Sequence, residues 1–301
     1  MKKQILTAIA LAGALWVSAQ VVEVASVNEV ALPYNVTVMV PTISPDGTFV
    51  VASDFTSEAL RKITLADGAV STVTENGNGN GVAISADGSQ VVFRRNSIDN
   101  RHMRHVSLQS VALADGRETQ LAAPSRNIAA GVGLNGNCVS YRLGASTKTR
   151  SLDGVVAQPA PFVAINRGHL VYTTGGRSVN LDPQGKGSYL WPALSPDGTK
   201  IVYYLAGRGC FVCGTDGSNV RSLGLLRAAK WLDNNTVVGM VDTDDGHFTT
   251  ASHIVAERLD GTRQTLTSPE LIAMYPSASA DGSRIAFATP EGKLYLINLV
   301  K

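Results

Sequence analysis

Hydrophobic residues occur along this chain in short runs, each of which follows a turn. A motif of the form Ser-x-Asp-Gly occupies residues 44–47, 85–88, 195–198 and 279–282, and an apolar run begins two residues after each copy. In such a motif Asp accepts hydrogen bonds from the nearby backbone, and Gly adopts the left-handed conformation that closes a tight turn. The apolar runs are rich in β-branched residues and show no helical period. The pattern therefore predicts hairpins between β-strands.

Three weaker copies of this turn, at 134–136, 166–168 and 232–235, fill the gaps between the strong ones. The seven repeats are spaced about 39 residues apart, which is close to the length of one four-stranded β-propeller blade. Six of the repeats also contain a second turn, in which Gly closely follows Asp. These second turns lie at 67–68, 115–116, 153–154, 182–185, 216–217 and 260–261.

The last repeat lacks a fourth strand, because it stops after the strand predicted at 294–299. Residues 21–27 form a strand that belongs to no repeat and can supply the missing one. Pairing the two would cover an exposed sheet edge and close the ring. We therefore expect an all-β fold, a seven-bladed β-propeller of four-stranded antiparallel blades closed by the N-terminal strand. Six blades are the alternative.

Composition agrees with one globular domain over residues 20–301. Hydrophobic residues make up 44% of the chain and charged residues 17%, which excludes a disordered protein, and three cysteines are too few for a disulfide framework. The predicted repeats lie near 40–80, 81–127, 128–157, 158–188, 189–224, 225–268 and 269–301, the last completed by 21–27.

Residues 1–19 have the pattern of a secretory signal peptide. Lys2 and Lys3 precede a short uncharged stretch, and small residues stand before the expected cleavage after Ala19. No cysteine follows for lipid attachment, so we expect a periplasmic or secreted protein without membrane insertion. The two lysines account for the whole formal net charge of +2, and the neutral remainder offers no general attraction for nucleic acid. We expect a monomer.

Two repeats carry a longer motif, aromatic-Pro-x-x-Ser-x-Asp-Gly, beginning at Trp191 and Tyr275. This motif resembles the β-propeller repeat of the TolB type, and the resemblance extends over nearly the whole chain after residue 19. Relatives of this type often carry an α/β or hydrolase domain, for which we expect no room here, and no Gly-x-Ser-x-Gly motif is present. The resemblance implies that ligands bind on the face formed by the loops between second and third strands.

Two groups of residues are candidates for ligand binding on that face. The loop of the second repeat concentrates positive charge, which suits carboxylates, sulfates or an acidic partner, although a solvated loop is the alternative. Aromatic residues that precede the first strands should approach the mouth of the channel, where they either stack on a ligand or pack between blades. The candidates are Arg94, Arg95, Arg101, His102 and Arg104 in the first group, and Tyr189, Trp191 and Tyr275 in the second.

The loop of the sixth repeat contains the candidate metal ligands Asp242, Asp244, Asp245 and His247. Clustered carboxylates suit a hard divalent cation, but the calcium-loop pattern fails at Gly246 and lacks its distal Glu. A solvated loop is the alternative, and no other cofactor is expected. Cys210 and Cys213 should point to opposite faces of one strand, which argues for buried thiols and against a disulfide or shared metal.

No acid–base pair or nucleophile emerges from the sequence. The leading hypothesis is therefore a non-enzymatic scaffold that binds an envelope or extracellular protein, a peptide or a glycan on its loop face and central channel. The competing hypothesis is a metal-dependent polysaccharide lyase or hydrolase on a propeller scaffold. That enzyme would require the two loops to bring His102, His105, His247 and His253 together.

Overall fold

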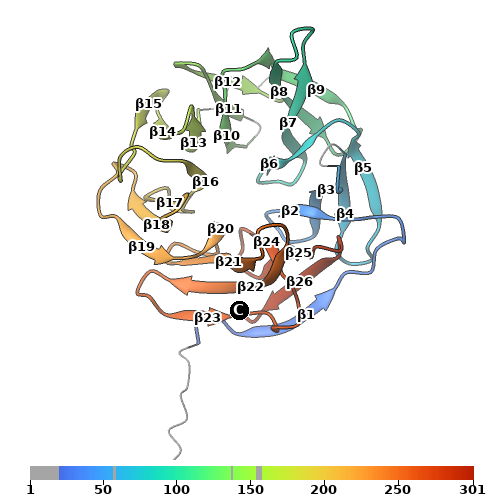
Figure 1. Ribbon diagram of the computed structural model, residues 1–301. Coiled ribbons are helices and arrows are strands. Elements are labelled where there is room, and N and C mark those ends of the chain that lie inside the picture. Colours follow the sequence, from blue (N-terminus) through green and yellow to red (C-terminus); the bar gives the residue numbers. More distant parts are fainter. Residues whose placement is uncertain (1–19, 57–58, 137, 154–157) are drawn as a thin grey trace, which may run out of the picture.

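The computed structural model describes residues 20–301 except 57–58, 137 and 154–157, and it shows an all-β ring (Figure 1). The predicted signal peptide lies outside the described residues. Within them, no helix has the length and apolar character needed to span a membrane.

Five sheets of the described chain are antiparallel and four-stranded, with consecutive strands as neighbours in four of them. The first contains β2 (Met39–Ile43), β3 (Phe49–Ser53), β4 (Leu60–Thr64) and β5 (Val70–Thr74), and the second β6 (Asn78–Ile84), β7 (Gln90–Ile98), β8 (Arg104–Ala112) and β9 (Glu118–Ser125). The next two contain β16 (Tyr189–Leu194), β17 (Lys200–Leu205), β18 (Gly209–Gly214) and β19 (Arg221–Gly224), and β20 (Arg227–Trp231), β21 (Thr236–Asp244), β22 (Thr249–Arg258) and β23 (Arg263–Thr265). The last contains β24 (Met274–Ala278), β25 (Arg284–Ala288), β26 (Leu294–Leu299) and β1 (Val24–Glu29).

The N-terminal strand closes the ring as predicted. β1 pairs antiparallel with β26, so that Val24 lies opposite Leu299 and Asn28 opposite Leu296. The strand begins three residues later than expected and reaches Glu29. First and last strands of the chain thus share one sheet, with β1 at its outer edge (Figure 1).

The expectation of seven separate sheets is wrong, because the third and fourth repeats form a single six-stranded sheet. Its order is β12 (Ser146–Ser151), β11 (Cys138–Leu143), β10 (Ile128–Asn135), β13 (Phe162–Asn166), β14 (His169–Thr174) and β15 (Arg177–Asn180). The described chain therefore has six sheets, as in the alternative.

Small residues explain this junction between repeats. The two halves of the sheet are joined by the single pair Ala130 and Ile165. A Cβ atom at Gly131 would lie only 2.4 Å from the carbonyl oxygen of Val163, so β10 and β13 approach more closely than larger side chains would allow. The core between the halves is correspondingly small and consists of Ala129, Phe162 and Ala164.

The first strand of every repeat lies on the inside of the ring. β2, β6, β10, β13, β16, β20 and β24 contact one another in this order, and β24 contacts β2. Apolar side chains between consecutive repeats form the core, with Phe93, Tyr203 and Phe287 among the largest that are fully buried. The ring therefore encloses a central opening.

The Ser-x-Asp-Gly turns connect first to second strands, as predicted. In the first sheet the buried Ser44 hydroxyl donates a hydrogen bond of 2.6 Å to Asp46 Oδ1 and accepts one of 3.0 Å from the backbone N–H of Phe49. Ser85, Ser195 and Ser279 make the same pair of contacts in their own sheets. We call the end of the ring with these turns the turn face. The opposite end, where second strands turn into third strands, is the loop face.

Candidate functional site

Irregularities in the inner strands shape the centre of the ring. In β2, β16, β20 and β24 two residues lie opposite a single residue of the neighbouring strand, which defines a β-bulge. At each of these bulges one residue has a positive φ: Val40 at 44°, Trp191 at 47°, Ala228 at 51° and Tyr275 at 55°. β6 and β10 have longer irregularities, with positive φ at Gly81 and Gly131.

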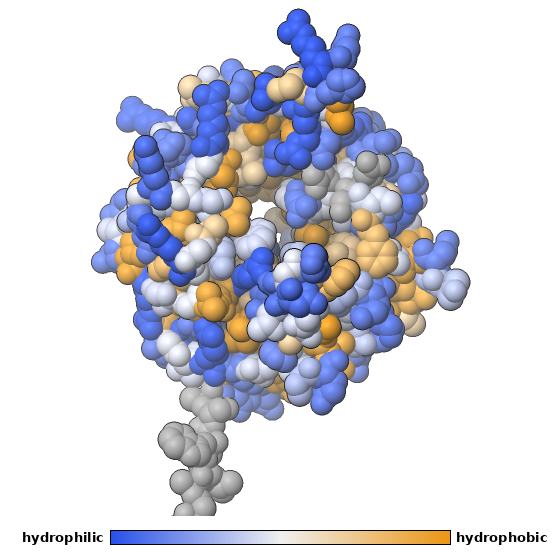
Figure 2. Space-filling view, in the orientation of Figure 1, coloured by the Kyte–Doolittle hydropathy of each residue, from blue (hydrophilic) through white to orange (hydrophobic). Residues whose placement is uncertain are grey.

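These bulges surround one cavity of about 400 Å³ at the centre of the ring. Figure 2 shows the molecule hollowed there. All six positive-φ residues of the inner strands line the cavity, and Ile165 of β13 completes the circle. Because the bulges lie near the start of the inner strands, the cavity belongs to the loop-face end of the ring.

The backbone at this cavity is strained. A positive φ is costly for residues other than glycine, above all for a β-branched residue such as Val40. Pro41, Pro192 and Pro276 follow three of the strained residues and line the cavity as well. Proline has no N–H group, so these positions leave no backbone donor unpaired in the interrupted strand. Strain of this kind clusters at ligand sites in many proteins, which marks the cavity as the candidate site.

Two cationic side chains line the cavity, and the sequence predicted one of them. Arg94 extends along β6, with its Cδ 3.7 Å from where a Cβ atom of Gly81 would lie. Burial lowers the pKa of Arg94, and the positive charge of Arg104 lowers it further. Lys230 follows the bulge of β20, and its side chain is exposed to the cavity. Desolvation by the neighbouring protein lowers the pKa of Lys230.

All three predicted aromatic residues line the cavity, in different ways. Tyr189 is 1% exposed and its hydroxyl donates a hydrogen bond of 2.9 Å to the carbonyl oxygen of Gly185, so it packs between strands. Trp191 and Tyr275 are half-buried. The ring of Trp191 lies 5.6 Å from that of Tyr204, and the Arg227 guanidinium lies over it at 5.9 Å.

The other cationic candidates of the second repeat do not reach the cavity. Arg95 forms an ion pair of 2.6 Å with Glu118 and hydrogen bonds to the backbone of Asn76. Arg101, His102 and Arg104 lie at or beside the tip of the β7–β8 hairpin. At this tip the Asp99 carboxylate accepts hydrogen bonds from backbone N–H groups and contacts the His105 ring. The structure therefore separates Arg94 from the rest of its predicted group.

The predicted metal ligands of the β21–β22 hairpin are not brought together. Asp242 is directed to Arg227, with which it forms an ion pair of 2.5 Å. Asp244 and Asp245 accept hydrogen bonds from backbone N–H groups of their own turn, including that of His247. Across the described residues, no three His, Cys, Asp or Glu side chains are grouped so that they could hold a metal ion.

The cysteines are buried, as predicted, and none of them forms a disulfide within the described residues. Cys210 packs in the core on one side of β18 and Cys213 in the core on the other. Burial raises the pKa of each thiol to about 12, so both are protonated at neutral pH. Neither thiol takes part in the candidate site.

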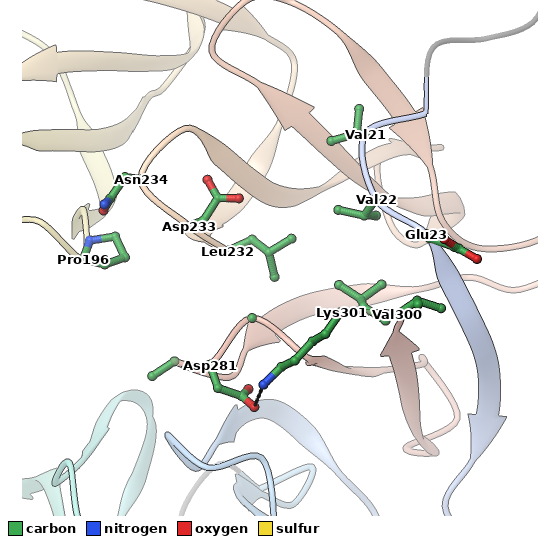
Figure 3. Close-up of a pocket in the computed structure, with 13 residues that line it drawn as sticks. Val21, Val22, Glu23, Pro196, Leu232, Asp233, Asn234, Asp281, Val300 and Lys301 are labelled. Atoms are coloured by element: carbon green, nitrogen blue, oxygen red, sulfur yellow. Dashed lines mark hydrogen bonds and ion pairs between the residues drawn. The ribbon is translucent and has the colours of Figure 1, made fainter.

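A second hollow, of about 530 Å³, lies on the turn face between the two chain ends (Figure 3). Val21 and Val22 border it on one side and Lys301 on another. Lys301 donates a hydrogen bond of 2.8 Å to Asp281, the Asp of a Ser-x-Asp-Gly turn. This contact fastens the C-terminus to the ring, and we assign the hollow a structural origin.

Sequence reasoning missed Lys230, although the repeats contain a signal for it. The residue just before the last apolar position of the inner strand is Thr42, Ala83, Ala193 or Ser277 in the strong repeats, and Lys230 in the sixth. A long charged side chain at a position that is otherwise small must point into open space. Alignment of the repeats would therefore have identified it.

Comparison with known proteins supports the fold. No protein-family model matches the chain, and no curated protein matches it. Among solved structures, one described as streptogramin B lyase is 15% identical, with a TM-score of 0.63, over 91% of this chain and 98% of that one. The Cps50 (Swd1) β-propeller domain of Myceliophteria thermophila is 12% identical, with a TM-score of 0.62, over 91% and 100%. These similarities establish a β-propeller fold.

Proposed function

We propose that this chain is a non-enzymatic binding scaffold of the periplasm or cell exterior. It receives a protein, peptide or glycan on its loop face, with the central cavity as the innermost part of the site. The proposal takes the chain to be a single propeller of the TolB type, monomeric, without affinity for nucleic acid and without a membrane anchor. One observation carries it: the distribution of exposed apolar side chains.

Large apolar side chains are exposed on the loop face. Within the described residues, five exposed hydrophobic side chains are larger than valine, and four of them lie at this end of the ring. Phe55 and Phe248 lie between second and third strands, Ile98 ends the second strand β7, and Leu225 precedes an inner strand. Their exposed fractions run from 55% for Phe55 to 75% for Phe248. Exposed apolar groups gathered on one face are typical of interaction surfaces.

The two longest hairpins extend this surface. β7, β8, β21 and β22 have nine or ten residues each, whereas strands of the first and last sheets have five or six. Ile98 and Phe248 lie at the ends of these hairpins, 71% and 75% exposed. The β7–β8 hairpin also carries Arg101 and Arg104 near its tip, and the β21–β22 hairpin carries Asp244 and Asp245. A partner with both apolar and charged groups fits such a surface.

The competing function, a metal-dependent polysaccharide lyase or hydrolase, has less support from the geometry. It needs several ligands to converge on one point, and the acidic side chains of the β21–β22 hairpin are engaged by Arg227 and by their own turn. Elemental analysis of the purified protein decides between the two functions. Stoichiometric manganese, zinc or calcium would favour the enzyme.

Capture of partners with matched surface variants tests the binding function. Immobilised protein is incubated with envelope extract of the source organism, and bound proteins are quantified by mass spectrometry. A partner retained by the unaltered protein should be retained at least tenfold less by Ile98→Ser/Phe248→Ser. The control Val179→Ser/Val220→Ser changes exposed valines away from the loop face and should retain the partner fully. Equal retention by both double variants would contradict the proposal.

A further inference from the structure

The central cavity contains two cationic side chains that the fold leaves without partners. Lys230 and Arg94 make no side-chain hydrogen bond or ion pair with any other described residue, and the Nε atom of Arg94 is buried and unpaired. Tyr275, at the same cavity, has a hydroxyl without a partner in the described part of the chain. Three unused hydrogen-bond donors therefore belong to residues that line one cavity.

No acidic residue of the described chain lines this cavity to balance the positive charge. The neighbouring cations are neutralised: Arg227 pairs with Asp242 at 2.5 Å, and Arg95 pairs with Glu118 at 2.6 Å. Desolvated charge without a counter-charge is unfavourable, and the buried, unpaired Nε atom of Arg94 is such a case. An anionic ligand would supply the missing charge.

The repeat architecture does not require a lysine at position 230. The residue pairs with Val238 directly after the bulge, as Thr42 pairs with Val51. The other strong repeats have Ala83, Ala193 and Ser277 at this place. Small residues are thus sufficient for the fold at this position. The lysine side chain can therefore interact with a ligand in the cavity.

The remaining wall of the cavity is mainly apolar. Val40, Pro41, Val82, Ile165 and Pro192 contribute to it, whereas Thr42, Asn80 and Trp191 add side chains that can form hydrogen bonds. A sugar would leave hydroxyl groups unpaired against the apolar part of this wall, which is costly. A ligand with one anionic group on an apolar body would leave none. The volume of about 400 Å³ is in the range of small-molecule sites.

We propose that the central cavity binds a small organic acid whose body is apolar, and that Arg94 and Lys230 supply the positive charge that attracts its carboxylate. The acid is either free or the C-terminal residue of a peptide, since both present the same chemistry. This inference rests on the proposed binding function and specifies the ligand class of its central cavity. Binding forms charge-assisted hydrogen bonds to the carboxylate and breaks no covalent bond.

Calorimetric titration of the chain from residue 20 tests the ligand class. The probes are 3-phenylpropanoate and its uncharged amide, N-acetyl-glycyl-phenylalanine and its C-terminal amide, and D-galacturonate. We expect at least one of the two apolar acids to bind at least tenfold more tightly than its own amide. Which acid binds identifies the source, free or peptide. Equal affinity for acid and amide, no binding of either acid, or tighter binding of galacturonate would overturn the inference.

Matched variants test the two residues. Lys230→Met and Arg94→Gln should each weaken binding of the acid at least tenfold. Lys148→Met and Arg150→Gln, which change exposed residues of the outer strand β12, should leave it unchanged. Unchanged binding in Lys230→Met and Arg94→Gln would overturn the assignment.

The variant Ile98→Ser/Phe248→Ser separates this inference from the proposed function. It should lose the captured partner and retain the acid. If the acid fails to bind while partner capture depends on the loop face, only this inference is wrong. If the acid binds while Ile98→Ser/Phe248→Ser retains the partner as well as the unaltered protein does, only the loop-face proposal is wrong.

Discussion

Glu29 and Tyr295 lie opposite each other where the first and last strands of the protein pair, and the Tyr295 hydroxyl donates a hydrogen bond of 2.9 Å to the Glu29 carboxylate. Lys293 donates a second, of 3.0 Å, to the same carboxylate. These two hydrogen bonds, Lys293 first, hold the pKa of Glu29 below its ordinary value. The contacts join residues from opposite ends of the chain and so belong to the closure of the ring.

Removal of residues 20–29 should therefore destabilise the whole ring. The deletion exposes the edge of β26 and removes the buried Val21, whose burial alone is worth about 1.5–3 kcal/mol. We expect the free energy of unfolding in urea to fall by at least about 3 kcal/mol. Glu29→Gln, which removes only an exposed ion pair, should cost less than about 1 kcal/mol. Similar losses in the two proteins would contradict the closure as a source of stability.

The serine of each Ser-x-Asp-Gly turn should contribute more to the free energy of unfolding than an exposed serine does. Ser44→Ala leaves the backbone N–H of Phe49 without its partner and should cost about 1–3 kcal/mol. Ser71→Ala, on the exposed surface of β5, is the control and should be close to neutral. Urea unfolding at pH 7 gives both values, and equal values would show that the turn does not need its serine.

Acid should reduce the difference in free energy of unfolding between Ser44→Ala and the unaltered protein. The hydrogen bond from Ser44 lowers the pKa of Asp46 below its unfolded value of about 3.9. A lowered carboxyl pKa stabilises the fold fully above the unfolded pKa, and this contribution is lost as the pH falls through the folded pKa. Urea unfolding at pH 3 should therefore show a smaller cost of Ser44→Ala than at pH 7. A larger cost at pH 3 would contradict this coupling.

Two glycines with the same backbone conformation should tolerate alanine differently. Gly68 and Gly198 both have φ of 70°, but a Cβ atom at Gly68 would lie 1.9 Å from the carbonyl oxygen of Ala31. No atom lies within 4 Å of the corresponding position at Gly198. Gly198→Ala should cost about 1–2 kcal/mol, from the left-handed conformation alone. Gly68→Ala should cost clearly more in the same urea titration, and equal costs would contradict the close approach.

Lys230→Met should leave the protein equally stable or more stable at pH 7. Desolvation lowers the pKa of Lys230, so its charge opposes folding in full below the folded pKa, and this cost disappears only as the pH rises to the unfolded pKa. A melting temperature at or above that of the unaltered protein is expected, with Lys148→Met unchanged. A lower melting temperature would mean that Lys230 supports the fold rather than a ligand. Loss of binding together with retained stability is the signature of a functional residue.

Much of the fold could be predicted because its signals are local. Ser44 and Gly47 identify a turn from four consecutive residues, and the unpaired N-terminal strand followed from counting strands in the last repeat. The junction of β10 and β13 could not be foreseen, since it depends on the approach of Gly131 to Val163 across repeats. That approach is a tertiary contact without a sequence pattern of its own.

The candidate site was predicted in part for similar reasons. Trp191 and Tyr275 were identified because they were expected to precede inner strands, and both line the cavity from within β16 and β24. Asp242 looked like a metal ligand because only its sequence neighbours were considered. Its partner Arg227 comes from the adjacent strand, and that pairing depends on the register of the folded sheet.

Fluorescence of Trp191 tests most directly whether the centre of the ring is a binding site. In the chain from residue 20, Trp231→Phe leaves Trp191 as the single tryptophan, and Trp191 lines the cavity. Titration with the apolar acid that binds more tightly in calorimetry should change its emission in a saturable way. The matching amide should not, and Lys230→Met in the same background should weaken the response at least tenfold. An emission that stays constant while calorimetry reports binding would place the acid outside the cavity and contradict the account.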